Sequence, residues 1–428
     1  MQSTSFDPAL ERPRFRPLQA VPFQEAGAQY LALIDPSGIL PEPVILAPDA
    51  ILILLLQTAD GEKTVPELAE IIREQTDFIV TPDKLRNVLV GLDKKGIMES
   101  TRIQELLNER MKAYRDQPTR KALLFQSQDK LAAIQFLRQE FARHTLMPDS
   151  PPAFLDLLGK GRLRALLTPH IDYRRGGSAY AWGYKALQQT SKPRTIIILG
   201  TLHVPSEEFF IATDKPFETA LGTVQVDTEL LREFEERFHG RLRHQEYLHA
   251  VETTIELQVT YLQHIYPDQD FRILPILVAN CDFFLEEEGV YPDHDRDAST
   301  MIELLRETLA NRPDVVLIGG VDLSHVGPEF GDDFLVTQEI EEEVRAQDYE
   351  MLDEIAALNP KGFFDHFRAT LNSRRVCSVA PIYTLLRAVE GKATPHILAY
   401  RQANSEKMDC MVSFCSAAFF EKSLIIMP

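Results

Sequence analysis

The chain has little cysteine and no long apolar run. Its four cysteines among 428 residues are too few and too scattered for the disulfide framework of a secreted protein. No apolar segment approaches the roughly 20 residues that a membrane-spanning helix needs, since the longest, at 51–56, ends after six residues. The first residues lack the basic and apolar regions of a secretory signal. We therefore expect a cytoplasmic protein that does not contact a membrane.

Positive charge is also scarce. Lys and Arg number 45 against 64 Asp and Glu, which gives a formal net charge of −19. Proteins that bind nucleic acid rely on Lys and Arg to neutralise phosphates, so this balance argues against a nucleic-acid partner. The chain also lacks a glycine-rich nucleotide-binding fingerprint, and no organic cofactor is implied. The hydrophobic content of 44% is ordinary for a globular protein.

The length and the changing pattern along the chain predict more than one domain. Residues 1–22, rich in proline and arginine, are expected to form an extended arm. Residues 23–100 predict a small, winged-helix-like α+β module, and residues 101–150 predict a helical connector. From residue 151 to residue 428, apolar strand-like runs alternate with amphipathic helical stretches. That alternation predicts a large α/β domain whose sheet carries helices on both faces.

The small module shows clear helix signals. A buried helix is expected at 48–58, and a capping-box pattern of Thr64 and Glu67 opens a second helix at 65–74. A third helix begins after Thr81 and ends at Gly96. Residues 97–100 then predict a short closing strand.

Three histidines and one cysteine mark the large domain. His170, His203 and His325 each follow an apolar run where a strand would stop, and Cys377 precedes an apolar helix. In an open α/β sheet, ligands bind at the carboxyl ends of strands, and imidazole and thiolate are good ligands for transition metals. These residues could therefore converge on one metal site. The alternative for each is a buried, hydrogen-bonded or packed side chain.

Other residues near these positions could support such a site. Asp172 is expected to orient an imidazole, and the pair Gly176–Gly177 predicts a tight turn or a close backbone approach. A helix N-terminus and two neighbouring arginines should lower the pKa of Cys377. Residues 209–212 and 223–227 are expected to form a β-hairpin over the site.

Asp322, Ser324 and His325 form the most suggestive short motif. An Asp beside a His can fix its tautomer, and a neutral His is a competent general acid or base. A Ser-His-Asp hydrolase is the rival interpretation, although the chain has no G-x-S-x-G nucleophile motif. His249, Glu252 and Glu256 are expected on one face of a helix, which either presents a carboxylate inward or lies in solvent.

Taken in order, these segments resemble the Memo family, also called AmmeMemoRadiSam system protein B. The resemblance runs from about Leu166 to Phe419. Its ordered motifs are Pro169-His170 with Tyr173 and Gly177, Leu199-Gly200 to His203, the segment 217–227, Asp322 to His325, and Cys377 with Pro381-Ile382.

The resemblance implies a fold similar to class III extradiol dioxygenases, which use non-haem iron. By that similarity His170, His203 and Cys377 would be metal ligands, His325 the acid/base, and Asp322 its support. Iron is the first candidate metal, with copper or zinc as alternatives. The thiolate in place of a dioxygenase carboxylate is a departure that puts ring cleavage in doubt. Thr253 and Ser378 depart from the family's usual His and Gly.

Residues 23–100 also resemble PqqD-like peptide-recognition domains. The family association further implies a radical SAM protein and an AMMECR-like protein as partners. The resulting hypothesis is metal-dependent redox chemistry on a small molecule or peptide. Its alternatives are a non-enzymatic metal- or peptide-binding adaptor and a metal-assisted hydrolase, which would activate a bound water.

Overall fold

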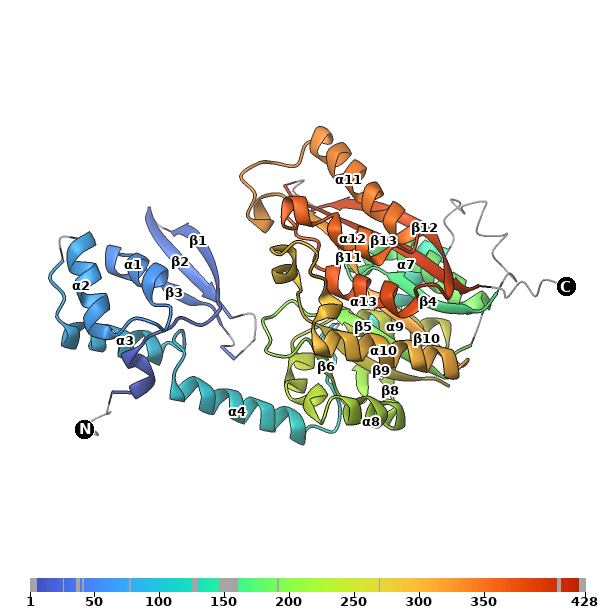
Figure 1. Cartoon of the computed structure of the whole chain (residues 1–428), viewed down its shortest axis with the longest axis horizontal. Helices are drawn as coiled ribbons and strands as arrows, with labels where there is room; N and C mark the ends of the chain where they lie inside the picture. The colour runs from blue at the N-terminus through green and yellow to red at the C-terminus, as the bar shows by residue number, and fades with distance from the viewer. Residues whose placement is uncertain are drawn as a thin grey trace. The chain divides into compact units, whose positions relative to one another are not determined.

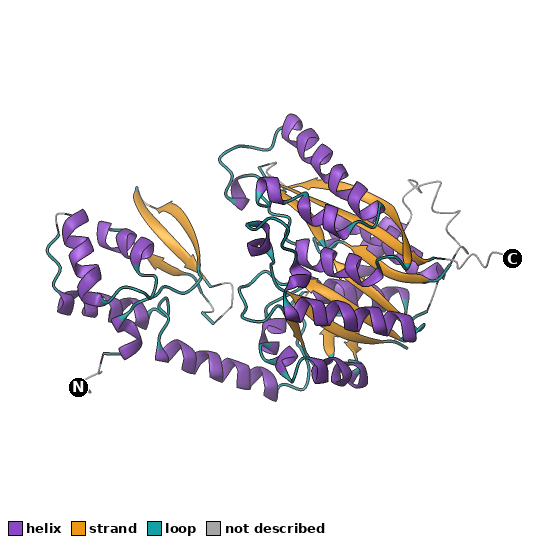
Figure 2. Ribbon diagram, in the orientation of Figure 1, coloured by secondary structure: helices purple, strands orange, loops and turns teal. Residues whose placement is uncertain are grey.

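The structure, a computed structural model (Figures 1 and 2), divides the chain into two compact units, residues 1–117 and 118–428. It describes residues 6–25, 27–35, 39–40, 42–76, 78–124, 130–145, 161–190, 192–268, 270–405 and 409–422.

The first unit is a small α+β domain with a three-stranded antiparallel sheet in the order β1-β2-β3. The capping box predicted at Thr64 and Glu67 is present at the start of the second helix. Leucines from these helices and from the sheet form one hydrophobic core. Its elements are η1 (Pro8–Glu11), β1 (Gln19–Glu25), β2 (Ala28–Ile34), β3 (Val44–Leu46), α1 (Ala50–Thr58), α2 (Val65–Gln75), α3 (Pro82–Lys94) and α4 (Thr101–Asp116).

Two features of this unit differ from the sequence-based expectation. Residues 1–5 of the expected arm lie outside the described residues. Residues 6–22 pack into the unit rather than forming a separate arm, because Leu10 is buried in the core and Arg16 forms a buried ion pair with Asp35 at 2.7 Å. Residues 97–100 do not form a strand. Met98 makes only an isolated bridge with Phe15, because the chain enters α4 directly afterwards.

The second unit is built on a large mixed sheet, which confirms the predicted α/β class. The strand order is β11-β13-β4-β10-β5-β9-β6, with β12 paired to β13. The four central strands, β4, β10, β5 and β9, are parallel. The strands are β4 (Leu163–Thr168), β5 (Thr195–Thr201), β6 (Phe210–Ala212), β9 (Arg272–Val278), β10 (Val315–Gly320), β11 (Asp322–Val326), β12 (Ala393–Asn404) and β13 (Met411–Glu421).

Helices cover both faces of this sheet. Successive residues of a strand point to opposite faces, and a Cβ added to Gly319 would approach Leu385 of α13, whereas one on Gly320 would approach Gln258 of α9. The continuous apolar runs of β4, β5 and β10 follow from this burial on two sides. The helices are α5 (Lys130–Thr145), α7 (Tyr173–Thr190), α8 (Thr228–Arg237), α9 (Thr254–Ile265), α10 (Arg296–Asn311), α11 (Gln338–Ala356), α12 (Pro360–Asp365) and α13 (Val379–Val389).

Short elements complete the unit. A two-stranded sheet joins β7 (Phe217–Thr219) to β8 (Gly222–Val224), and the 3₁₀ helices are η2 (Arg241–Arg243), η3 (Glu246–Ala250), η4 (Asp282–Leu285), η5 (Pro292–His294), η6 (Pro328–Phe330) and η7 (Arg368–Thr370). Within the part of the chain that the structure describes, none of the helices has the length and apolar character required to cross a bilayer.

Two local predictions are corrected here. The hairpin is β7–β8, while residues 210–212 pair with β9 instead. Gly176 and Gly177 lie inside α7 rather than in a turn. The close approach predicted for this pair does occur, since a Cβ on Gly176 would lie 2.5 Å from Ile171. The two units divide at Gln117/Pro118, inside the segment for which a connector is predicted.

Candidate metal centre

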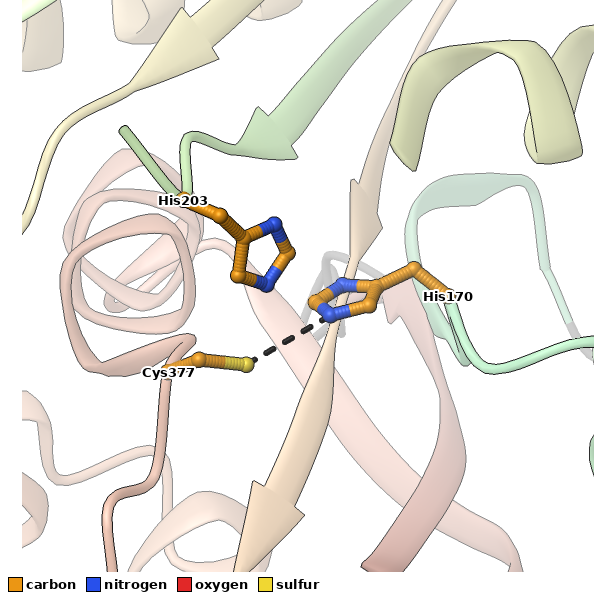
Figure 3. Close-up of side chains that lie close together, drawn as sticks. All are labelled: His170, His203 and Cys377. Carbon is orange, nitrogen blue, oxygen red and sulfur yellow. Dashed lines mark hydrogen bonds between the residues drawn. The ribbon is translucent and has the colours of Figure 1, made fainter. Parts of the chain in front are cut away.

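His170, His203 and Cys377 come together at one edge of the large sheet. Their ligand atoms all lie within 4.8 Å of one another, and Cys377 Sγ is 3.4 Å from His170 Nε2. The two imidazole rings stand almost perpendicular, at 87°, with centroids 5.1 Å apart. Figure 3 shows the three side chains pointing toward a common centre.

The strand register explains this convergence. Thr168, Gly320 and Gly200 are aligned across β4, β10 and β5, so the residues that follow β4 and β5 leave the same edge of the sheet. His170 and His203 each stand two positions beyond the end of their strands, and Cys377 stands two positions before α13. Of the four residues predicted to converge, the structure brings His170, His203 and Cys377 into one cluster, and His325 is not part of it.

His170 is held by groups from three elements. Its Nδ1 lies 2.9 Å from the carbonyl oxygen of Gly320, and because a carbonyl only accepts, Nδ1 carries the proton and Nε2 faces Cys377. The backbone N–H of His170 donates to Asp322 Oδ1 at 3.0 Å. Gln258 of α9 donates to the Pro169 carbonyl at 2.7 Å and accepts from Thr168 Oγ1 at 2.7 Å. The loop carrying His170 is thus fixed at its start.

His203 is oriented by Glu252, a role that the sequence analysis did not assign. Glu252 Oε2 accepts from the His203 backbone N–H at 3.1 Å and lies 3.0 Å from its Nδ1. The other oxygen, Oε1, accepts from the backbone N–H groups of Thr253 and Thr254 at 2.7 and 3.0 Å. This carboxylate leaves Nε2 of His203 free, which is the arrangement that outer carboxylates give to metal-binding histidines.

Opposite charges set the protonation of the cluster. Burial alone would raise the pKa of the Cys377 thiol, but His170 and His325 hold that pKa well below its ordinary value. Burial would lower the pKa of His170, yet Asp322 and Cys377 outweigh it and raise this pKa to about 9. Burial likewise opposes the ionisation of Glu252, but the hydrogen bond and charge of His203 outweigh it and lower the pKa of Glu252 to about 2. Without metal the cluster is an imidazolium–thiolate site.

The cluster fits a first-row transition metal. Metal–nitrogen bonds of about 2.0 Å and metal–sulfur bonds of about 2.3 Å place tetrahedral N and S ligands about 3.5 Å apart, close to the 3.4 Å between His170 Nε2 and Cys377 Sγ. Three protein ligands leave a coordination position for water or substrate, as in catalytic rather than structural sites. The His203 side chain is 45% exposed, so the site is open on that side.

Asp172 and Asp322 contact other groups than those that the sequence-based expectation assigned to them. Asp172 is exposed and accepts from Arg175 Nε at 2.5 Å. Asp322 is buried and lies 3.5 Å from His170 Nε2, so it acts on His170. His325 Nδ1 instead lies 2.9 Å from the Leu323 carbonyl oxygen. The acid/base roles predicted for His325 and Asp322 stay predictions.

The hydrolase triad is not assembled. Ser324 is fully buried, and its Oγ donates to Asp348 Oδ1 at 2.7 Å, so this hydroxyl points away from His325. Arg374 also binds Asp348, at 2.7 Å, and Arg375 binds Asp332, at 2.7 Å. The two arginines are therefore engaged elsewhere, and the histidines are what lowers the pKa of Cys377.

Ser378 joins the cluster to its surroundings. Its Oγ accepts from the Asp322 backbone N–H at 3.0 Å and lies 2.9 Å from Thr201 Oγ1 and 3.4 Å from Cys377 Sγ. The Ser378 hydroxyl therefore contacts the Cys377 sulfur and leaves the imidazole nitrogens of the cluster unoccupied.

Of the two alternatives for His249, Glu252 and Glu256, the structure shows the inward one. All three are buried, although they belong to η3, the loop before α9, and α9 rather than to one helix. Glu256 pairs with the fully buried Arg120, which also donates to the backbone oxygens of His249 and Glu252. This network fixes the backbone at Glu252, the residue that orients His203.

Comparison with known proteins shows which family the chain matches. A model of the family described as Memo-like protein matches residues 119–418. A MEMO1 family protein of Thermus thermophilus is 27% identical over 341 residues, which cover 78% of this chain and 94% of that protein. A MEMO1 family protein of Aquifex aeolicus is 22% identical over 393 residues, covering 90% of this chain and 95% of that protein.

A solved structure also matches. It is the crystal structure of the uncharacterized protein JW3007 from Escherichia coli K12, which is 14% identical and aligns with a TM-score of 0.32 over 60% of this chain and 99% of its own.

Proposed function

This chain belongs to the Memo-like protein family, and from the geometry of its His–His–Cys cluster we propose that it binds one redox-active transition metal and performs metal-dependent redox chemistry on a small molecule or peptide. The observation that carries the proposal is the approach of His170, His203 and Cys377 within 4.8 Å, with both imidazoles oriented through Nδ1. Iron is the first candidate, and copper also suits a mixed imidazole–thiolate set.

A metal bound there would supply an open coordination position and one-electron chemistry. Glu252 would hold the Nε2 lone pair of His203 toward the metal, and the Gly320 carbonyl would do the same for His170. Asp322 would balance positive charge beside His170. His325, whose charge acts on Cys377, is the proposed group that accepts or donates a proton at the substrate.

A test is the metal content of protein purified without oxygen, comparing wild type with His203→Ala and Cys377→Ala. We expect about one iron or copper per chain in wild type and its loss in both variants, because each removes one of three ligands. Cys281→Ala is the matched control. Cys281 is also a free cysteine, but it is buried outside the cluster, so this variant should keep its metal.

Other outcomes separate the alternatives. A stoichiometric zinc ion, inert to oxygen, would replace the redox proposal with a metal-assisted hydrolase, in which a bound water is activated. Protein that contains no metal and refuses added iron, copper and zinc would leave a non-enzymatic binding adaptor.

The partners proposed from the family association are a radical SAM protein and an AMMECR-like protein, and a PqqD-like role for the first unit would deliver a peptide. Co-purification from a host carrying all three proteins tests this. We also propose a reducing, cytoplasmic location, since a thiolate ligand must stay reduced and all four cysteines are free.

A further inference from the structure

A cavity lies at the end of the large sheet opposite the His170–His203–Cys377 cluster. It has a volume of about 740 Å³ and is lined by the first residues of β4 and β12, the last residues of β13, and the ends of α10 and α13. Figure 1 shows α10 and α13 near one another on this unit. Arg164 at the cavity and His170 at the metal centre are six positions apart along β4, roughly 20 Å at 3.3 Å per residue. The cavity is therefore separate from the metal centre.

Arg164 is a buried cation that faces this cavity. Only 6% of the residue is exposed, and the one hydrogen bond recorded for its guanidinium is a long one, 3.5 Å, to the Pro313 carbonyl oxygen. Within the described residues no carboxylate lies at ion-pair distance from it. Burial accordingly lowers the pKa of Arg164. Glu421, which also lines the cavity, and Asp314 act on Arg164 only from beyond ion-pair distance, so the guanidinium is available to an anion that enters the cavity.

The charged side chains of the lining carry a positive excess. Lys392 and Lys422 line the cavity, and neither has an ion-pair partner among the described residues. Arg306 differs, because it donates to the Arg387 carbonyl oxygen at 2.7 Å and to Glu390 at 3.0 Å. In all, the cavity is lined by four cationic and two anionic side chains, in a chain whose net charge is −19.

The remaining walls are apolar. They consist of Leu309, Ala310, Ala388, Val389 and Ala393. A concave site with apolar walls and a few polar groups is the usual form of a small-molecule site. A small inorganic anion would leave these walls unused, whereas an anion with a hydrocarbon body would contact both parts of the lining.

We propose that this cavity binds a medium-chain organic carboxylate, with the carboxylate on Arg164, Lys392 and Lys422 and the hydrocarbon chain against the alanines and Leu309. A guanidinium pairs with a carboxylate in a bidentate geometry that strengthens the bond. The ligand stabilises the buried charge of Arg164 and does not depend on the metal.

The test is calorimetric titration of the full chain with decanoate, 1-decanol and propionate. Decanoate should bind one per chain, at least tenfold more tightly than 1-decanol, which lacks the charge, and propionate, which lacks the chain. Arg164→Leu should weaken decanoate binding at least tenfold. Arg232→Leu is the matched control, since this arginine of α8 is 67% exposed, pairs with Glu236 and does not line the cavity, so the affinity of this variant should equal that of wild type.

A second pair of variants covers the case in which Arg164→Leu does not fold. The double variant Lys392→Gln and Lys422→Gln changes two exposed side chains and should also weaken decanoate binding. Ala310→Phe should fill the cavity and weaken decanoate more than propionate. No binding of decanoate to wild type, or equal affinity in the lysine variant and in wild type, would overturn the proposal.

Discussion

At the scale of single residues, the centre depends on what holds Nδ1 of each histidine. The Gly320 carbonyl does this for His170 and the Glu252 carboxylate does it for His203. A carbonyl oxygen cannot be removed by substitution, but a carboxylate can. Glu252 is therefore the position where orientation can be changed while all three ligands are kept.

Replacing Glu252 with glutamine should reduce metal affinity by about 10- to 100-fold, the usual effect of losing a partner that orients a ligand. The glutamine amide has a single accepting oxygen in place of two, so it loses bonds to His203 or to the backbone at Thr253 and Thr254. Competition with a chromophoric chelator measures the affinity. Glu229→Gln, at an exposed carboxylate in the first turn of α8, is the control, and equal affinity in the two variants would show that Glu252 has no orienting role.

His249 makes stability depend on pH. Burial lowers its pKa from 6.5 to about 3, so the folded protein keeps this imidazole neutral while the unfolded chain binds a proton below pH 6.5. The contribution of neutral His249 to the free energy of unfolding is fully present above pH 6.5. It is lost as pH falls toward 3, by about 1.4 kcal/mol per pH unit.

Urea unfolding between pH 7 and pH 5 measures this loss. His249→Gln can still donate to the Ile211 carbonyl, the partner of Nε2 at 3.0 Å, and does not titrate. Its free energy of unfolding should therefore fall less steeply than that of wild type. His294→Gln, at an exposed imidazole, should follow wild type, and parallel curves for all three proteins would contradict the assignment.

The proposed ligand residues could be predicted from the sequence because His170 and His203 follow apolar runs and Cys377 precedes an apolar helix. His170 and His203 need only the rule that parallel strands end at one edge. Their supports could not be predicted in the same way. Asp172 is near His170 in sequence, but Asp322 reaches it from another strand, and Glu252 reaches His203 across 49 positions. Sequence spacing carries no information about such contacts.

At the scale of elements, α7 lies unusually close to the sheet. A Cβ on Gly183 would lie 2.8 Å from Thr168, at the end of β4, and 3.4 Å from Ser416 of β13. Gly183→Ala should therefore destabilise the fold by about 1–3 kcal/mol through overpacking, which outweighs the gain in helix propensity of about 1 kcal/mol.

The matched control for Gly183→Ala is Gly91→Ala in α3. This glycine is also helical, but a Cβ there meets nothing within 4 Å. We expect Gly91→Ala to stabilise its unit by about 0.5–1 kcal/mol. Thermal unfolding of both variants shows whether Gly183→Ala lowers the stability while Gly91→Ala raises it. Stabilisation by both substitutions would mean that α7 can move away from the sheet at no cost.

The elements predicted best are those with local signals. The capping box at Thr64 and the buried runs of β5 and β10 give helix and strand boundaries directly. The short strands β6, β7 and β8 were harder to pair, because each has three residues and no period can be recognised over so few. Their partners are set by the neighbouring sheet, which the local sequence does not encode.

At the scale of the whole molecule, the second unit begins earlier than the change in sequence pattern indicates. Arg120 is fully buried and pairs with Glu256 of α9. Leu137 and Phe141 of α5 are buried as well, and Phe141 packs on Tyr173 and Tyr261. Some residues of the segment 101–150 therefore belong to the core of the large unit, although the helical composition of that segment predicts a connector.

A chain beginning at Pro118 should fold and unfold cooperatively, whereas one beginning at residue 151, the boundary that the sequence pattern predicts, should not. The shorter chain leaves Glu256 as a buried carboxylate without its guanidinium, which costs about 3–5 kcal/mol, and uncovers Tyr173 and Tyr261. That loss is comparable to the whole stability of many domains. Circular dichroism during thermal unfolding distinguishes the two chains, with Arg120→Met in the full chain as the control for the ion pair alone. Equal cooperativity in the 118–428 and 151–428 chains would show that residues 118–150 are an accessory segment and that Glu256 is satisfied without Arg120.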